Sequence, residues 1–350
     1  MNRHITVRAK NHFSFLVDVK ALITIVILIV LTFLFILSSA AIGEKNFSLI
    51  RVFQTFLGNG SSLENLFILS FRMPRIIMSL FVGICLAVAG TILQNIVKNP
   101  LASPDVIGIT GGASLAVVIF LTQFSTMSTS LTVSIKWLPA VAITGAFLTG
   151  LLIYIFAWSK GISPIRLVLI GIGISLFTQS LTTLFMISGP LYQAQQANVW
   201  ITGTVATASW EQINVLFPVV LLLMILSLFS IRMMNIQELG DTIARGTGNQ
   251  VQLTKSLLFI LSVSLTGMSV AFAGAISFVG LIAPHIARKL VGSMYGALLP
   301  VAALVGGMIV IASDLIGRTL FAPIQVPAGV FTAAIGAPYF LYLLYSNRNV

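Results

Sequence analysis

Long apolar runs, separated by short polar segments, occupy almost the whole of this sequence. An α-helix needs about 20 apolar residues to cross the hydrocarbon core of a bilayer, and windows of that length recur along the chain. We therefore expect an all-α, polytopic membrane protein with about ten transmembrane helices. The predicted spans are residues 21–41, 74–97, 108–124, 138–158, 166–187, 213–233, 256–273, 276–290, 298–317 and 327–345.

The eighth predicted span, residues 276–290, differs from the others because helix-breaking residues lie in and around it. Gly274 and Gly280 precede Pro284, and Gly292 follows. Proline removes a backbone hydrogen bond and kinks a helix, and irregular backbone at membrane depth must be buried in protein or line water. We expect this segment to be short or bent.

The composition supports one membrane domain and excludes a water-soluble fold. Charged residues make up 8% of the 350 residues and hydrophobic residues 57%, whereas soluble domains carry about 25% charged residues. The mean hydropathy is +1.05. We divide the chain into an N-terminal segment (1–20), a transmembrane domain (21–345) and a C-terminal tail (346–350).

The formal net charge of +11 reflects membrane topology better than nucleic-acid binding, since the basic residues lie between apolar runs and form no single patch. Cytoplasmic loops carry an excess of lysine and arginine, and placing both termini in the cytoplasm puts 13 of the 19 basic residues inside. Residues 21–41 also resemble a cleavable signal peptide, but we expect an uncleaved helix because the apolar run reaches membrane length. The inner residues are Arg3, Arg8, Lys10, Lys20, Lys98, Lys160, Arg166, Arg232, Arg245, Lys255, Arg288, Lys289 and Arg348, and the outer ones are Lys45, Arg51, Arg72, Arg75, Lys136 and Arg318.

A weak internal repeat relates two segments that lie 184 residues apart. Residues 87–92 read AVAGTI and residues 271–276 read AFAGAI, with a proline and a glycine at matching distances after each. A true repeat would make the two halves inverted in the membrane, which is common in transporters. The alternative is that small residues recur because they let membrane helices approach closely.

No motif in the sequence supplies energy for transport. The phosphate-binding pattern G-x-x-x-x-G-K-[ST] is absent, so any ATPase must be a separate polypeptide. The predicted spans lack the central ionisable residues that ion-coupled carriers usually need, although such a carrier or a channel remains the alternative class. We predict no catalytic residue, cofactor or metal site, because Cys85 is the single cysteine and His285 has no companion ligand at suitable spacing.

The longest predicted cytoplasmic loop, residues 234–254, offers a separate ATPase a surface to contact. Small residues permit close contact between helices and tight turns. Taken alone, however, the loop fits an ordinary solvated segment with glycine turns better. The residues that suit a contact are Leu239, Gly240, Ala244, Gly246 and Gly248.

Two ordered blocks of residues, which together span about 72–344, resemble the FecCD-type permease family. That family imports iron-siderophores, haem and cobalamin with a dimeric ATPase and an external binding protein. The first block is Arg72, Met73, Pro74, Arg75, Gly83, Leu86, Ala87, Gly90, Gln94, 99–104, Gly108 and 111–113. The second is Gly274, Ile276, 278–281, Pro284, His285, Arg288, Leu299, Pro300, Asp314, Arg318, Pro327, Gly329, Gly336 and Pro338.

The resemblance implies a docking site and a coupling site. The family's docking arginines for the binding protein correspond to Arg72, Arg75 and Arg318, and its pair of short ATPase-coupling helices corresponds to residues 239–248. Without the resemblance, we would interpret Arg72 and Arg75 as interfacial anchors of a helix, and Arg318 as a local partner of Asp314 at i,i+4 spacing.

This chain departs from the family pattern at two positions near those sites. Thr247 stands where the family usually has leucine, so the apolar contact with the ATPase is weakened there. Gln325 stands where the family often has glutamate, which removes an external negative charge.

We therefore predict the permease subunit of an ABC importer for iron(III)-siderophore-type chelates in the bacterial cytoplasmic membrane. Haem or cobalamin import by the same mechanism is the alternative. The expected partners are an ATP-binding cassette ATPase dimer, an extracytoplasmic substrate-binding protein and a second permease subunit, identical or paralogous. The substrate path is expected at the interface of the two permease subunits.

Overall fold

The computed structural model describes residues 4–9, 13–43, 45–124, 135–159, 161–189 and 191–346. Arg3, Lys10, Lys160, Arg348 and most of the predicted tail lie outside these ranges. The helices are α1 (Val19–Ala41), α2 (Leu49–Phe56), α3 (Ser62–Glu64), η1 (Asn65–Arg72), α4 (Met73–Val97), α5 (Ile109–Gln123), η2 (Ile135–Trp137), α6 (Leu138–Ala157), α7 (Pro164–Ser188), α8 (Leu191–Thr202), α9 (Trp210–Glu238), α10 (Asp241–Gly246), α11 (Val251–Ala273), α12 (Val279–Val291), α13 (Tyr295–Thr319) and α14 (Ala328–Ser346).

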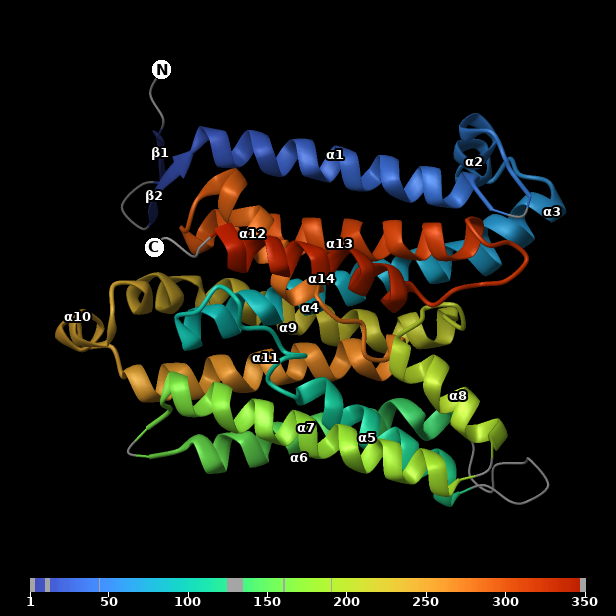
Figure 1. The fold of residues 1–350 in the computed structure, drawn as a ribbon. Coiled ribbons are helices and arrows are strands. Elements are labelled where there is room, and N and C mark those ends of the chain that lie inside the picture. The colour runs from blue at the N-terminus through green and yellow to red at the C-terminus, as the bar shows by residue number, and fades with distance from the viewer. Residues whose placement is uncertain are drawn as a thin grey trace.

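The long helices lie side by side in one bundle (Figure 1). Within the described residues, eight helical segments are long and apolar enough to cross a membrane. Each of the ten predicted spans coincides with a helix, but α5 has 15 residues and α12 has 13. The polytopic, predominantly helical fold is confirmed, and α12 is short, as its glycines and proline indicate.

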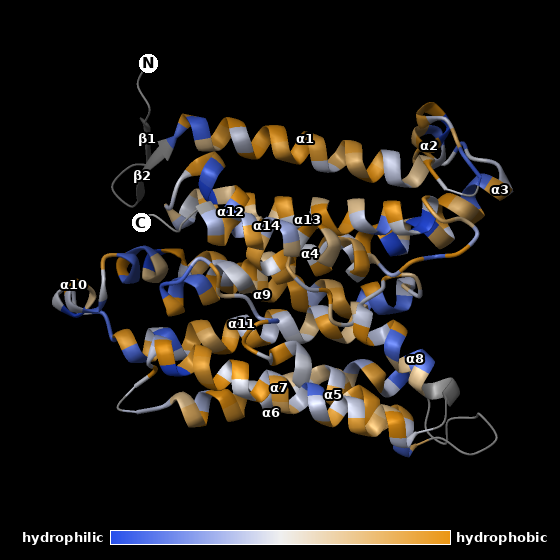
Figure 2. Cartoon of the chain, in the orientation of Figure 1, coloured by the Kyte–Doolittle hydropathy of each residue, from blue (hydrophilic) through white to orange (hydrophobic). Residues whose placement is uncertain are grey.

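The two described ends of the chain and α10 lie at one end of the bundle, whereas α2, α3 and α8 lie at the other (Figure 1). We call these the inner and the outer end, following the predicted topology. Hydrophilic residues gather mainly near the two ends, and apolar residues cover the long helices between them (Figure 2). This distribution fits a bundle whose middle faces hydrocarbon.

A two-stranded hairpin is the departure from an all-α fold among the described residues. Strand β1 (His4–Ala9) pairs antiparallel with β2 (Phe13–Asp18), with Ile5 opposite Val17. Asp18 then accepts a hydrogen bond from the Lys20 N–H at 2.9 Å and so caps the start of α1.

Helix α4 forms the buried centre of the bundle and packs against α11, α12 and α13 through small residues. A Cβ atom on Gly90 would lie 1.8 Å from the Gly280 oxygen in α12, and one on Gly83 would lie 2.2 Å from the Gly306 oxygen in α13. The Ser262 hydroxyl of α11 donates to the Ala89 carbonyl at 3.0 Å. Membrane helices use small residues in this way to bring their backbones together.

The two segments of the weak sequence repeat run in opposite directions, since α4 runs from the outer end to the inner end and α11 runs back (Figure 1). Their central glycines nevertheless have different settings. Gly90 lies inside α4, whereas Gly274 follows α11 at a φ of +69°. The inverted repeat therefore stays a prediction.

Candidate partner sites at the two ends of the bundle

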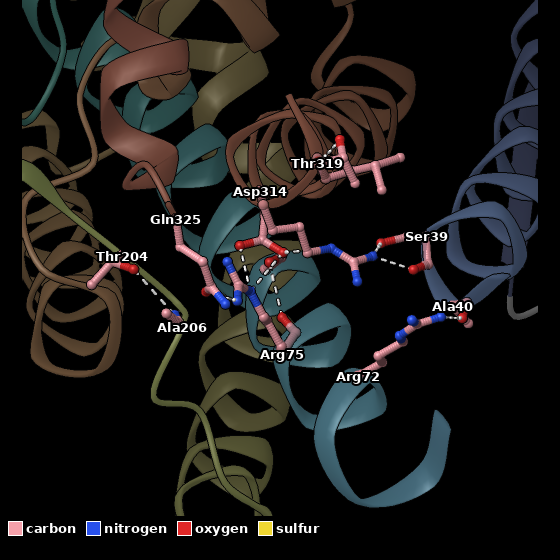
Figure 3. Close-up of polar contacts among 12 residues, drawn as sticks. Ser39, Ala40, Arg72, Arg75, Thr204, Ala206, Asp314, Thr319 and Gln325 are labelled. Carbon is pink, nitrogen blue, oxygen red and sulfur yellow. Dashed lines mark hydrogen bonds and ion pairs between the residues drawn. The ribbon is translucent and has the colours of Figure 1, made fainter. Parts of the chain in front are cut away.

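The outer end holds the three arginines that the sequence singles out, and the fold brings them together. Arg75 lies in the first turn of α4 and points towards α13 and the segment that follows it (Figure 3). Its Nε atom lies 2.7 and 2.9 Å from the two carboxylate oxygens of Asp314, and its Nη1 donates to the Gln325 Oε1 at 2.8 Å. Gln325, which stands where the family often has glutamate, thus accepts a hydrogen bond from Arg75.

Arg72 and Arg318 point instead towards the end of α1. Nη1 of Arg72 donates to the Ala40 carbonyl at 2.6 Å and to the Ala41 carbonyl at 3.2 Å. Arg318 donates to the backbone carbonyl and, at 2.8 Å, to the hydroxyl of Ser39. The last carbonyls of a helix lack intrahelical partners and carry partial negative charge, so the two guanidinium groups stabilise the outer end of α1.

The cluster is cationic and largely buried. Arg72 is 7% exposed and Arg318 is 8% exposed, and Asp314 is the carboxylate that contacts Arg75 and Arg318. The i,i+4 pair between Arg318 and Asp314, which the sequence suggested as the alternative, is present at 3.8 Å. The docking role of the three arginines stays a prediction, and their side chains already have acceptors in their own chain.

At the inner end, a short helix projects beyond the bundle between α9 and α11 (Figure 1). Gly240 precedes this helix, α10, at a φ of +99°, which residues with a side chain rarely adopt. Leu239 is 61% exposed and Ile243 is 55% exposed. Apolar side chains at a water-facing end of a membrane protein suit contact with another protein.

The predicted coupling residues lie in α10 and in the segments that flank it, and they differ in burial. Ala244 is fully buried in its own chain, whereas a Cβ on Gly240, Gly246 or Gly248 would meet nothing within 4 Å. Residues 239–248 contain one short helix, because α9 continues to Glu238 and α11 begins at Val251. The expected pair of short helices is therefore wrong, and Leu239 and the glycines are the predicted residues that remain accessible.

A polar network lies directly behind α10, and sequence reasoning missed it. Lys255 of α11 pairs with Asp241 of α10 at 2.6 Å, and Lys98 lies 3.9 Å from Glu238 at the end of α9. Burial lowers the pKa of Lys98, and the carboxylates of Glu238 and Asp241 act against that shift. The sequence signal that could have revealed this ion pair was that Lys255 lies close along the chain to Asp241, one of its few acidic residues.

No group of three or more His, Cys, Asp or Glu side chains that could hold a metal ion lies within the described residues. The His285 ring packs edge-on against Tyr339, with 5.7 Å between the ring centroids. Cys85 is buried and free.

Comparison with known proteins connects this fold to a transport family. The model of the FecCD transport family matches residues 27–346. The probable siderophore transport system permease protein YfhA of Bacillus subtilis (strain 168) is 54% identical over 330 residues, covering 94% of this chain and 96% of that protein. The iron(3+)-hydroxamate import system permease protein FhuG of the same organism is 39% identical over 326 residues, covering 93% and 97%.

A solved structure gives the same result at the level of the fold. The chain matches a metal-chelate type ABC transporter in an inward-facing conformation with a TM-score of 0.82 and 29% identity. The match covers 92% of this chain and 98% of that one. This chain is therefore a membrane permease that belongs to the FecCD transport family.

Proposed function

We propose that this permease carries iron(III)-siderophore-type chelates across the cytoplasmic membrane as the transmembrane subunit of an ABC importer. The observation that carries the proposal is the combination of a FecCD-type bundle with an exposed α10 at its inner end. The names of two relatives refer to siderophore and iron(3+)-hydroxamate transport, which supports a ferric chelate as the substrate.

An ATP-binding cassette dimer is the proposed energy source. The sequence lacks a phosphate-binding loop, so hydrolysis must take place on another polypeptide. The exposed Leu239 and Ile243 give such a partner an apolar surface to grip. ATP-driven closure of the dimer would then displace α10 and alternate the access to a path between two permease subunits.

An extracytoplasmic binding protein is the proposed source of substrate, docked at Arg72, Arg75 and Arg318. Their present acceptors include neutral carbonyls, and a carboxylate accepts a stronger, charge-assisted hydrogen bond from a guanidinium group. Carboxylates on the binding protein could therefore replace these acceptors. On docking, the arginines would exchange hydrogen bonds within the permease for hydrogen bonds to the binding protein, because their side chains already have partners.

Reconstitution in lipid vesicles tests the proposal. The purified chain alone should neither hydrolyse ATP nor accumulate a labelled ferric chelate. Addition of the ATPase and the binding protein should produce ATP-dependent accumulation. Accumulation by the chain alone, driven by an ion gradient, would reject the importer and favour an ion-coupled carrier.

A further inference from the structure

Lys255 is a buried cation at the inner end of the membrane domain. Its side chain is 2% exposed, and its Nζ donates to the Asp241 Oδ2 at 2.6 Å. A buried ammonium group is costly unless a charge and hydrogen bonds compensate it. Asp241 is the first residue of α10 and Lys255 lies near the start of α11, so this ion pair ties the projecting helix to a transmembrane helix.

The chain on both sides of α10 has the freedom to bend. Gly240 precedes the helix at a φ of +99°, and Gly248 follows it at +81°. A Cβ on either glycine would meet nothing within 4 Å. Glycine is the residue with the largest backbone freedom, so α10 can pivot on these two positions unless its own contacts, the buried Ala244 and the ion pair of Asp241, hold it.

The end of α9 is tied to two other helices. The Glu238 carboxylate accepts from the Tyr295 hydroxyl at 3.2 Å and from the Asn95 amide at 3.4 Å. Tyr295 is the first residue of α13, and Asn95 lies in the last turn of α4. The Lys98 ammonium group, just after α4, donates to the backbone carbonyl of Gln237.

The start of α13 depends on the same region. The Tyr295 N–H donates to the Asn235 Oδ1 of α9 at 3.0 Å, and the residue before it, Met294, gives no side-chain cap. The inner ends of α4, α9 and α13 therefore form one hydrogen-bonded unit. The Gln237 side-chain amide of α9 donates to the Val251 carbonyl of α11 at 3.5 Å, and the pair between Lys255 and Asp241 connects α11 to α10.

We infer that Lys255 is a positioning residue whose ion pair with Asp241 fixes α10 to the transmembrane helices. Displacement of α10 then moves the bundle instead of bending the chain at Gly240 and Gly248. The inference rests on the proposed function, because the ATPase supplies the displacement. It adds the requirement for a specific ion pair behind the contact surface. Loss of the pair should leave ATPase binding at Leu239 and Ile243 intact while separating hydrolysis from transport.

The first test measures the amount of chelate transported per ATP hydrolysed in the reconstituted complex. Lys255→Met and Asp241→Asn should each lower this ratio by ~10-fold, within the range of measured coupling effects, while the ATPase remains bound. The double variant should be no worse than either single variant, because both remove the same interaction. Lys289→Met, an exposed lysine at the same end of the bundle, is the matched control and should keep the ratio of the parent protein.

Unchanged ratios in both single variants, or effects that multiply in the double variant, would overturn the inference. A loss of ATPase binding in Lys255→Met would also overturn it, since Lys255 would then maintain the contact surface and not its mechanical connection. A complex that transports nothing even with the parent chain would reject the proposed function. The next measurement would still test whether the ion pair between Lys255 and Asp241 fixes the position of α10.

The second test needs neither ATP nor substrate. Spin labels on Ile243→Cys and Met294→Cys, in a Cys85→Ser background, report the distance between α10 and the start of α13. We expect a narrow distribution of distances in the full chain and in Lys289→Met, and a clearly broader one in Lys255→Met. Equal widths in all three proteins would show that α10 is held without the ion pair and would overturn the inference.

Discussion

The two ends of the bundle present different kinds of surface to the proposed partners. At the outer end, the three arginines singled out by the sequence are buried or largely buried and already paired, with Arg72 and Arg318 on the carbonyls of α1 and Arg75 on Asp314. At the inner end, α10 presents apolar side chains to the surroundings, and its ion pair lies behind it.

This difference separates two kinds of contact. A partner can bind an apolar surface on a fixed helix through shape complementarity, without rearrangement of the helix. Paired arginines must first give up internal acceptors, so an outer partner has to compete with the fold of its own target. Changes at the outer end should therefore affect stability and docking together, whereas changes at the inner end should affect them separately.

Arg318→Glu should have the largest effect on the fold. It would place two carboxylates at i,i+4 spacing, remove the hydrogen bonds to Ser39, and leave buried charge unpaired, which costs about 3–5 kcal/mol. Thermal unfolding in detergent should show a large loss of stability. The matched control is Arg51→Glu, because Arg51 is 61% exposed and lies 3.9 Å from Glu64. Equal stability of the two variants would remove the structural role of Arg318.

Arg75→Glu should weaken docking of the binding protein by about 2–5 kcal/mol, or at least ~30-fold in Kd, because a partly desolvated pair becomes a repulsion. Titration of the binding protein against the purified permease measures this effect. Reversing the facing carboxylates of the binding protein to arginine should restore affinity. Unchanged affinity of the single variant, with no rescue in any pairing, would make Arg75 a structural residue only.

Ala244→Trp and Gly246→Trp should separate stability from assembly at the inner end. Ala244 is fully buried, so a tryptophan there overpacks its own chain and costs about 1–3 kcal/mol of stability. Gly246 faces open space, so a tryptophan there should leave unfolding unchanged and block copurification of the ATPase. If Gly246→Trp assembles and transports normally, the ATPase contacts another face of the permease.

Gln325→Glu should have the smallest effect. A carboxylate opposite the Nη1 of Arg75 should add about 0.2–1 kcal/mol of stability, the usual contribution of an exposed ion pair. It should also weaken docking slightly, because it neutralises part of the charge offered to the binding protein. Unfolding and docking titrations on Gln325→Glu measure both changes, and a gain in docking affinity would contradict the competition between internal and external acceptors.

The membrane spans were predictable because the length of an apolar run can be read from the local sequence and compared with the thickness of the bilayer. The span predicted at residues 74–97, for example, is the helix Met73–Val97. Helix α8 was missed because three glutamines and an asparagine lower the hydropathy of residues 193–198. The end of α9 was placed too early, since its last turn continues past the apolar run to Glu238.

The site residues were predictable as chemical groups but not in their contacts. The pair between Arg318 and Asp314 follows from i,i+4 spacing within one helix. The contact between Arg318 and Ser39 joins residues 279 positions apart, and no local pattern encodes it. The burial of Ala244 likewise depends on how a six-residue helix packs against its neighbours.

Uptake of labelled substrates in cells with and without this chain tests the central claim most directly. The cells must contain the ATPase and the binding protein, and ferric siderophore chelates, haem and cobalamin are each supplied. We expect energy-dependent uptake of a ferric chelate to require the chain, and uptake of haem and cobalamin to be unaffected by its loss. Uptake of every ferric chelate at the same rate without the chain would contradict its assignment as the permease of a ferric-chelate importer.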